Sequence, residues 1–461
     1  MVDPRSQTRL IPRVYVNIPD RNTPDEAWKR LTVPSKNPDF IYTSKRIPER
    51  DYKIHNDIRE YAIEYRKNPQ MSKTMSSSYL ERFIPFKSSI KCYEEYSSPN
   101  KNIRFGKLLE EIDDIGGSIT GRHIECLRSS DICFPITAGV EQIYSNMPDT
   151  IEDYKLCGHV AYTRNALMVV YISLEIVRHK AVMSTRIMAP KVIPKLGVWN
   201  KNTVAVFSAT FLQYNTMTGR SEPVGQLIYS TPQEKQMYDQ MAARHILKQN
   251  HLKQANRILL LAEQNKYNNS ITSTGVKDHP NFSSDLDKNT LFETVYISST
   301  KIENTFTANP QYRNCNGKVF GGYIIRDSYE FSCTGVTYFL RSSQFRLIKI
   351  NDIIFRSPMM AGDHIRMTFE VICSNGPQGA DLITCTTTET RNPNTLEYKV
   401  AVMMYTTFVS RDPSVKVKMV LPETNKEKHF WSIGHELIQQ KNECYLEFVG
   451  KTDESEKMAK L

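Results

Sequence analysis

Residues 313–322 combine an asparagine, a polar loop and a glycine pair directly before a long, mostly apolar segment. Gly321 and Gly322 lack a Cβ atom, so the backbone there can turn tightly and approach another group closely. The residues that follow place apolar side chains at helical spacing, which predicts a helix over 323–340. The first turn of such a helix presents unpaired N–H groups and the positive end of the helix dipole. This arrangement can bind an anion or polarise a carbonyl oxygen.

A shorter version of the same pattern occurs earlier in the chain. Residues 105–115 begin with a phenylalanine and a single glycine, Gly106, and place apolar side chains at helical spacing. This spacing predicts a second helix with one buried face. When Gly106 is aligned with Gly322, Asp113 falls beside Tyr329. An internal repeat of this kind indicates duplication of one domain.

Other short motifs match catalytic signatures only in part. The segment His123-Ile124-Glu125 matches half of a zinc-deaminase motif, but the Pro-Cys-X-X-Cys half is missing. The serine in 117–121 has the wrong spacing for a nucleophile elbow and lies in a helical pattern. His159 begins an apolar run and is predicted to be a packed histidine. The sequence also has no His-Glu-X-X-His, phosphate-binding loop or dinucleotide fingerprint.

Composition narrows the classes of function. The length of 461 residues predicts about two to four domains. The net charge of +10 fits either a solvated basic surface or a partner that carries phosphates. No zinc-finger spacing or RNA-binding aromatic string supports a nucleic-acid partner. The nine scattered cysteines include no Cys-X-X-Cys pair, which favours reduced thiols over a disulfide framework or a zinc site. The longest apolar run, 166–177, is too short to span a membrane as a helix.

The segment from Arg313 to Gly322 resembles the helix entry of acyl-CoA thioesterases with the hotdog fold. The resemblance is specifically to the mitochondrial two-hotdog type, the acyl-CoA thioesterase 9-like family. That family has an asparagine, a Phe-Gly-Gly sequence and then a Tyr-Glu pair, which is Tyr329-Glu330 here. The resemblance covers most of the chain. It continues through Ile350–Phe355, Pro358 and Gly362-Asp363, and is fainter over 78–214 and 420–422.

The resemblance implies an α+β fold with two tandem hotdog domains, each an antiparallel sheet wrapped around a long central helix. The order of one helix followed by several strand-like runs also favours α+β over alternating βαβ units. Strands are predicted over 157–176, 181–188, 204–214, 291–306, 347–355, 364–373, 380–391 and 396–410, and further helices over 56–66, 233–264 and 430–441. The expected segments are a polar, partly disordered extension (1–77), hotdog domain 1 (78–232), a helical connection with a mobile linker (233–290), hotdog domain 2 (291–411) and a tail (412–461).

The resemblance implies hydrolysis of acyl-CoA to a free fatty acid and coenzyme A at a site between the two hotdogs. This reaction needs a base for the attacking water and donors for the developing oxyanion. Asn314 lies eight residues before Gly322, where related proteins have a water-orienting residue. Asp113 lies seven residues after Gly106, where they have the acidic base. The backbone N–H groups of Gly322 and its neighbour Gly321 would polarise the thioester carbonyl.

The reciprocal site is incomplete in the sequence. Ser98 stands eight residues before Gly106, where an asparagine or aspartate is expected, and Tyr329 occupies the position of Asp113. Glu330 is the remaining candidate for a base in a second site. The sequence therefore favours one complete composite site.

Each of these assignments has an alternative. Asn314 could cap the helix or the turn before it, and Asp113 could pair with a basic residue. The chain could then be a non-catalytic acyl-CoA-binding or scaffold protein on the same fold. A hydratase is less consistent, because the Gly-Asp-X-Asn-Pro-X-His string of such hotdogs is absent.

The resemblance also implies partners and a location. No cofactor and no metal are expected, and the substrate is an acyl-CoA. The chain is expected to form a homo-oligomer, commonly a trimer of double-hotdog chains, in the mitochondrion. Arg5, Arg9 and Arg13 resemble a transit segment only faintly, because Pro4 and Pro12 interrupt the helix that it needs.

Overall fold

The computed structural model describes residues 72–98, 103–124, 133–177, 202–246 and 294–439, except for short gaps at 146, 149, 216–217, 315–317, 375, 377–380 and 397. The predicted helix over 56–66, the predicted strand over 181–188 and the transit-like segment lie outside the described residues, as do the linker at 265–289 and the end of the tail.

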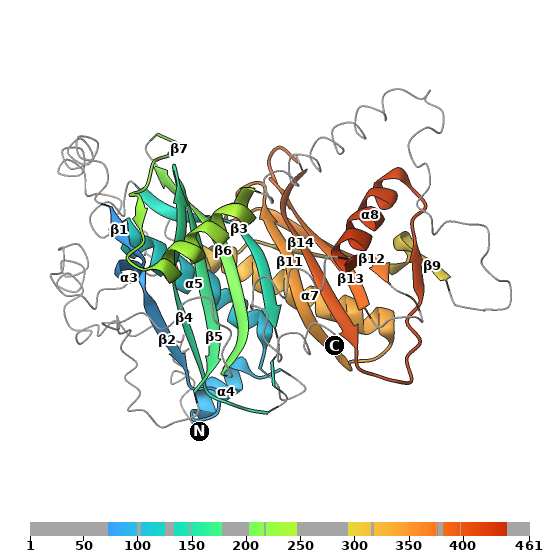
Figure 1. Ribbon diagram of the computed structural model, residues 1–461. Helices are drawn as coiled ribbons and strands as arrows, with labels where there is room; N and C mark the ends of the chain where they lie inside the picture. The colour runs from blue at the N-terminus through green and yellow to red at the C-terminus, as the bar shows by residue number, and fades with distance from the viewer. Residues whose placement is uncertain are drawn as a thin grey trace, which may run out of the picture.

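Two long helices lie at the centre of the fold, α5 (Phe105–His123) and α7 (Gly321–Leu340), as the apolar spacing predicted (Figure 1). In α7 the buried residues recur at intervals of three and four, so this helix has one apolar side. α5 is buried on almost all sides, including Glu111 and Asp114, which is more than the single buried face that the spacing predicted. The buried apolar side chains include Leu108, Leu109, Ile112 and Ile115 in α5, and Ile324, Ile325, Val336 and Leu340 in α7. The two helices begin at equivalent positions of the repeat, since alignment of Gly106 with Gly322 also aligns their first residues.

Eleven strands of the described chain form one antiparallel sheet. They are β2 (Leu80–Ile84), β3 (Cys133–Ser145), β4 (Tyr154–Arg164), β5 (Leu167–Ile176), β6 (Thr203–Asn215), β7 (Arg220–Ser221), β10 (Ile302–Thr307), β11 (Phe345–Phe355), β12 (His364–Ser374), β13 (Asp381–Arg391) and β14 (Tyr398–Ser410). The strand order is β10-β12-β13-β14-β11-β3-β6-β5-β4-β2, and β7 pairs with β6. The predicted strand over 157–176 is the hairpin of β4 and β5, in which Asn165 has a positive φ of 53°.

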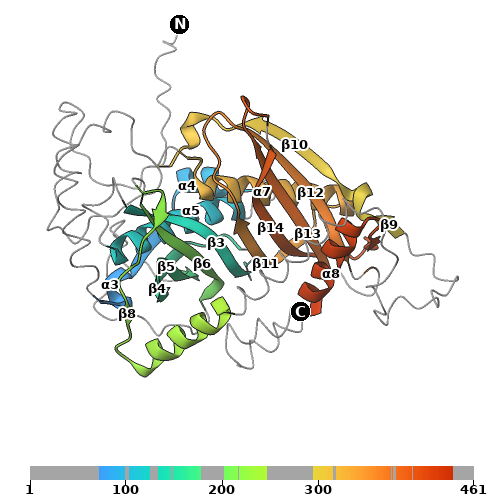
Figure 2. The same cartoon turned by 90° about the horizontal axis from the view of Figure 1, so that it is seen from above.

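Equivalent strands join the two halves of the sheet. β3 is the first strand after α5, β11 is the first strand after α7, and the two pair antiparallel through Val140–Ile353 and Ile143–Ile350. Figure 2 shows the strands of one half continuing into those of the other at this pair. We call α5 with β2 to β7 the first unit, and α7 with β10 to β14 the second unit.

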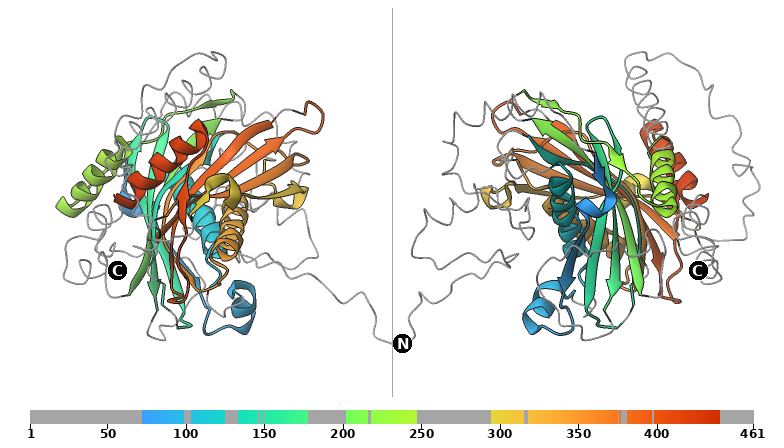
Figure 3. Two further views of the ribbon diagram at one scale, coloured as in Figure 1. Left: turned by 90° about the vertical axis from the view of Figure 1, so that its right-hand side faces the viewer. Right: turned by 60° about the vertical axis from the view of Figure 1, so that its left-hand side comes forward.

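The helices form separate layers on the two faces of the sheet. Figure 3 shows α5 and α7 side by side on one face, and α8 (Asn425–Gln439) with the helix over 232–246 on the other. In each unit an antiparallel sheet thus covers one long helix, which confirms the α+β fold with two tandem hotdogs. No helix among the described residues has the length and apolar character needed to cross a membrane.

The strand predicted over 291–306 is wrong in its middle. The structure has β9 (Thr294–Tyr296), a 3-10 turn η3 (Ile297–Thr300) and then β10. The Ser299 hydroxyl donates to the Tyr296 carbonyl at 2.7 Å, and the Thr300 hydroxyl donates to the Ile297 carbonyl at 2.8 Å. Such local bonds compete with strand pairing and break the strand. β9 pairs instead with β15 (Met419–Leu421).

The predicted helix over 430–441 is α8, which begins earlier, at Asn425. The reason is a capping box at Thr424 and Glu427. The Glu427 N–H donates to the Thr424 hydroxyl at 3.2 Å, and the Glu427 carboxylate accepts from the Thr424 N–H at 3.1 Å. The remaining short elements are β1 (Lys73–Thr74), α3 (Met75–Ser78), α4 (Ile90–Tyr96), β8 (Leu227–Ile228) and η4 (Pro310–Tyr312).

Candidate active site

The N-terminus of α7 lies against the middle of α5. A Cβ atom added at Gly321 would lie 3.1 Å from Asp113 Oδ2, and one added at Gly322 would lie 3.0 Å from Asp113 Cβ. Any larger residue at these positions would therefore press on Asp113. The glycine pair allows the close approach that the sequence predicted. It also brings the carboxylate of the first unit to the first turn of the second unit's helix.

Asp113 is held in this position by a threonine that sequence reasoning missed. The Thr137 hydroxyl donates to Asp113 Oδ1 at 2.6 Å, and Asp113 is only 5% exposed. Thr137 lies in β3 next to a register shift between Thr137 and Gly139, and such bulges redirect side chains. The two carboxylate oxygens thus have different surroundings. Oδ1 accepts from Thr137, and Oδ2 faces the glycine pair.

The first turn of α7 offers backbone donors to a ligand. Phe320 is the N-cap residue, and no side-chain hydrogen bond caps the helix there. The first N–H groups of an α-helix have no partner within the helix. They point toward the positive end of the helix dipole, where negative charge is stabilised. The arrangement can therefore stabilise an oxyanion close to Asp113.

Asn314 belongs to the loop that leads into α7. Its N–H donates to the Lys318 carbonyl at 2.7 Å, and its Oδ1 accepts from the Lys318 N–H at 3.2 Å. These bonds close the loop, as the turn-capping alternative predicted for Asn314. The loop also contacts the first unit, since Lys318 Nζ lies 5.0 Å from the centre of the Tyr214 ring at the end of β6. Asn314 therefore lies close to the boundary between the units.

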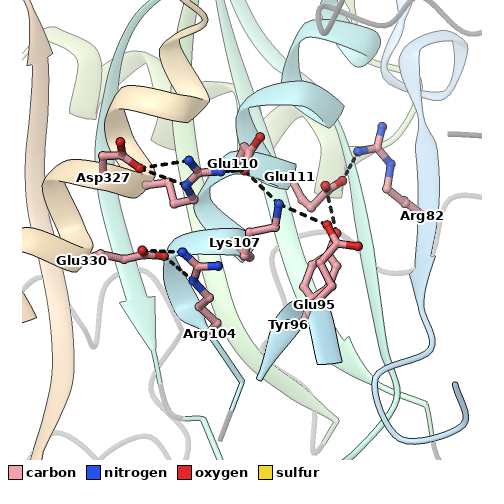
Figure 4. A network of polar contacts seen from close by, with 10 residues as sticks. Arg82, Glu95, Tyr96, Arg104, Lys107, Glu110, Glu111, Asp327 and Glu330 are labelled. Carbon is pink, nitrogen blue, oxygen red and sulfur yellow. Dashed lines mark hydrogen bonds and ion pairs between the residues drawn. The ribbon is translucent and has the colours of Figure 1, made fainter. Parts of the chain in front are cut away.

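Glu330, the candidate base of the reciprocal site, has a cationic partner. Figure 4 shows it beside Arg104, the residue that precedes α5. Arg104 Nε and Nη2 donate to the two carboxylate oxygens of Glu330 at 2.7 and 2.6 Å. A Cβ atom added at Gly106 would lie 2.6 Å from Glu330 Oε1. The reciprocal helix entry is thus occupied by an ion pair.

The histidine motifs have structural roles. The His123 ring lies in the last turn of α5 and donates from Nε2 to the Gly225 carbonyl at 3.0 Å. Burial lowers the pKa of His123 to about 4, and it lowers the pKa of His159 to about 4 as well. Both side chains are almost fully buried, as predicted for a packed histidine at 159. Among the described residues, no cluster of three or more histidine, cysteine or acidic side chains could hold a metal ion.

The fold is that of a two-hotdog protein, and sequence relatives agree with that class. Acyl-coenzyme A thioesterase 9, mitochondrial, of Bos taurus is 23% identical over 393 residues, which cover 80% of this chain and 81% of the relative. Acyl-coenzyme A thioesterase 2, chloroplastic, of Humulus lupulus is 25% identical over 77% of this chain and 79% of its own length. No family model matches. The relatives confirm the resemblance to the acyl-CoA thioesterase 9-like family.

Solved structures are similar over parts of the chain. An acyl-CoA hydrolase from Staphylococcus aureus in complex with butyryl coenzyme A and coenzyme A has 19% identity and a TM-score of 0.30; it covers 33% of this chain and 93% of that structure. A putative oleoyl thioesterase from Lactobacillus plantarum has 10% identity and a TM-score of 0.38; it covers 73% of this chain and 98% of that structure.

Proposed function

We propose that this chain is an acyl-CoA thioesterase that hydrolyses fatty acyl-CoA to a free fatty acid and coenzyme A. The observation that supports this best is the contact between Asp113 of the first unit and the Gly321–Gly322 helix entry of the second. A carboxylate beside backbone donors can serve both halves of thioester hydrolysis, since one group accepts a proton and the other stabilises an oxyanion.

The proposed reaction assigns one task to each group. The N–H of Gly322 or its neighbour Gly321 polarises the thioester carbonyl, and Asn314 orients a water molecule. Asp113 accepts a proton as the water oxygen bonds to the carbonyl carbon and forms a tetrahedral oxyanion. When this intermediate collapses, the carbon–sulfur bond breaks, and the proton on Asp113 passes to the leaving thiolate. Thr137 keeps Asp113 in place by its hydrogen bond to Oδ1.

We further propose one active site in each chain. Glu330, the candidate base of the reciprocal site, is bonded through both carboxylate oxygens to Arg104. This bidentate contact directs both oxygens at the arginine rather than at a water molecule beside a substrate. The reciprocal position would then bind no substrate productively.

The domain bounds, the oligomeric state and the location in the cell are further proposals. The two hotdog domains would span 78–232 and 291–411. The chains would assemble as homo-oligomers, with a trimer of double-hotdog chains as the specific expectation. A mitochondrial location is supported by the Bos taurus relative, which is named mitochondrial; the Humulus lupulus relative is named chloroplastic.

The test is thiol release from a series of acyl-CoAs of short to long chain. We expect turnover by the unaltered protein, and a loss of about a hundredfold or more in Asp113→Asn and in Asn314→Ala, because each removes a positioned catalytic group. Glu330→Gln is the matched control. It should stay within about threefold of the unaltered protein, since Glu330 has no part in the proposed reaction. Binding of acyl-CoA without thiol release would instead favour the non-catalytic binding protein.

A further inference from the structure

Charged side chains lie along the place where α5 and α7 cross (Figure 4). The two helices run antiparallel, since Gly106 lies against Glu330 at one end and Asp113 lies against Gly322 at the other. Between these contacts, Arg326 Nη1 donates to Glu110 Oε2 at 2.7 Å. Figure 4 shows Glu110 at the centre of a row of charged side chains along this crossing.

Glu110 and Arg326 occupy the same position in the internal repeat. Glu110 is the sixth residue of α5, and Arg326 is the sixth residue of α7. Equivalent residues that touch each other lie on the local two-fold axis that relates the two units. If two first units paired in this way, Glu110 would meet a second Glu110. If two second units paired, Arg326 would meet a second Arg326.

The pair is largely buried, so the signs of its two charges affect stability. The side chains of Arg326 and Glu110 are only 16% and 12% exposed, so solvent and salt screen their interaction less than that of a surface pair. Burial alone would lower the pKa of Arg326, yet Glu110 and then Asp327 raise it above its ordinary value. Lys107 Nζ is a second cation near Glu110 Oε2, at 3.2 Å. Two like charges in this place would repel each other strongly.

We infer that Glu110 and Arg326 select the pairing of a first unit with a second unit over the pairing of like with like. Only unlike units can place opposite charges on this axis. The same pairing brings Asp113 to the helix entry of α7, so Glu110 and Arg326 are positioning residues for the composite site. The activity readout of this inference rests on the proposed function, whereas its stability readout does not.

The test is a charge-reversal cycle in the full chain: Glu110→Arg, Arg326→Glu and the double variant. We expect each single variant to lower the thermal unfolding midpoint by about 4 °C or more. We also expect kcat for thiol release to fall about tenfold or more while KM changes little, because the catalytic groups lose their alignment. The double variant should recover a large part of both losses. Recovery should be incomplete, since Lys107 and Asp327 keep their charges.

Arg366 and Glu389 provide the matched control, because they form an ion pair within the second unit. Arg366 Nε donates to Glu389 Oε2 at 2.7 Å between β12 and β13. Reversal of either charge should leave kcat unchanged. The inference is overturned if the double variant loses as much as the two single variants combined. If the unaltered protein releases no thiol, the proposed function fails, and the unfolding midpoints of the cycle still decide the pairing.

Discussion

The two oxygens of the Asp113 carboxylate are in different environments. Oδ1 accepts from the Thr137 hydroxyl, and Oδ2 faces Gly321 at the entry of α7. A general base benefits when one oxygen is anchored and the other is directed at the reacting water, because little reorganisation is then needed. Thr137 therefore positions the proposed base through its hydrogen bond to Oδ1.

Replacement of Thr137 tests this role. Thr137→Val keeps the shape of the side chain and removes the donor, so we expect kcat to fall by about 10- to 100-fold, the worth of a hydrogen bond to a charged group. KM should change little, because the proposed role of the hydroxyl is to hold Asp113. Thr137→Ser retains the donor and should restore most of the activity. Equal activity of the valine and serine variants in a thiol-release assay would contradict the assignment.

At the scale of elements, close contact between helix and sheet determines where α7 can lie. Gly335 packs against the Phe369 ring of β12, and an added Cβ atom would overlap that ring. The absence of a side chain at 335 thus lets α7 approach the sheet, although glycine is a poor helix former. The interior of a protein is densely packed, so such a contact cannot absorb an extra methyl group without a shift.

A substitution at this contact should destabilise the second unit. Gly335→Ala is expected to lower the free energy of unfolding by about 1–3 kcal/mol through overpacking, which exceeds the gain of about 1 kcal/mol in helix propensity. Thr334→Ala, at the exposed neighbouring position, is the control and should change stability little. Thermal unfolding monitored by circular dichroism measures both. An unchanged or higher midpoint for Gly335→Ala would show that the helix can move away from β12.

At the scale of the whole molecule, two buried histidines link stability to pH. His123 and His159 both have a pKa of about 4 in the folded protein, lowered by burial from an ordinary value of 6.5. The unfolded chain therefore binds more protons than the folded chain between pH 6.5 and 4. By linkage, the free energy of unfolding falls as the pH falls through this window, and the histidine contribution is fully present above pH 6.5.

The expected loss is on the order of 3 kcal/mol for each histidine by pH 4. His159→Gln removes one of the two groups, so its unfolding midpoint should depend less steeply on pH between 6.5 and 4. His364→Gln, at an exposed position in β12, should keep the original slope. Unfolding midpoints measured between pH 6.5 and 4 test this link between histidine protonation and stability. Parallel curves for His159→Gln and the unaltered protein would exclude the linkage.

The sequence by itself determined the two central helices, their alignment through Gly106 and Gly322, and the α+β order of elements. These features depend on local spacing: apolar residues three and four apart define a buried helix face, and a glycine pair marks a close approach. The sequence also placed Asp113 and the glycine pair in one candidate site, through family resemblance. The capping box at Thr424 was not predicted, although its residues lie only three positions apart in the sequence.

Only the tertiary structure decided which groups meet across the units. Thr137 reaches Asp113 from a neighbouring strand, Arg104 pairs with Glu330, and Glu110 pairs with Arg326. No spacing rule predicts these contacts, because the partners in each pair lie on different elements. Their meeting depends on the antiparallel packing of α5 on α7 and on the union of β3 with β11. The physical reason is that side-chain partners across an interface are set by the relative placement of whole elements, which local sequence does not encode.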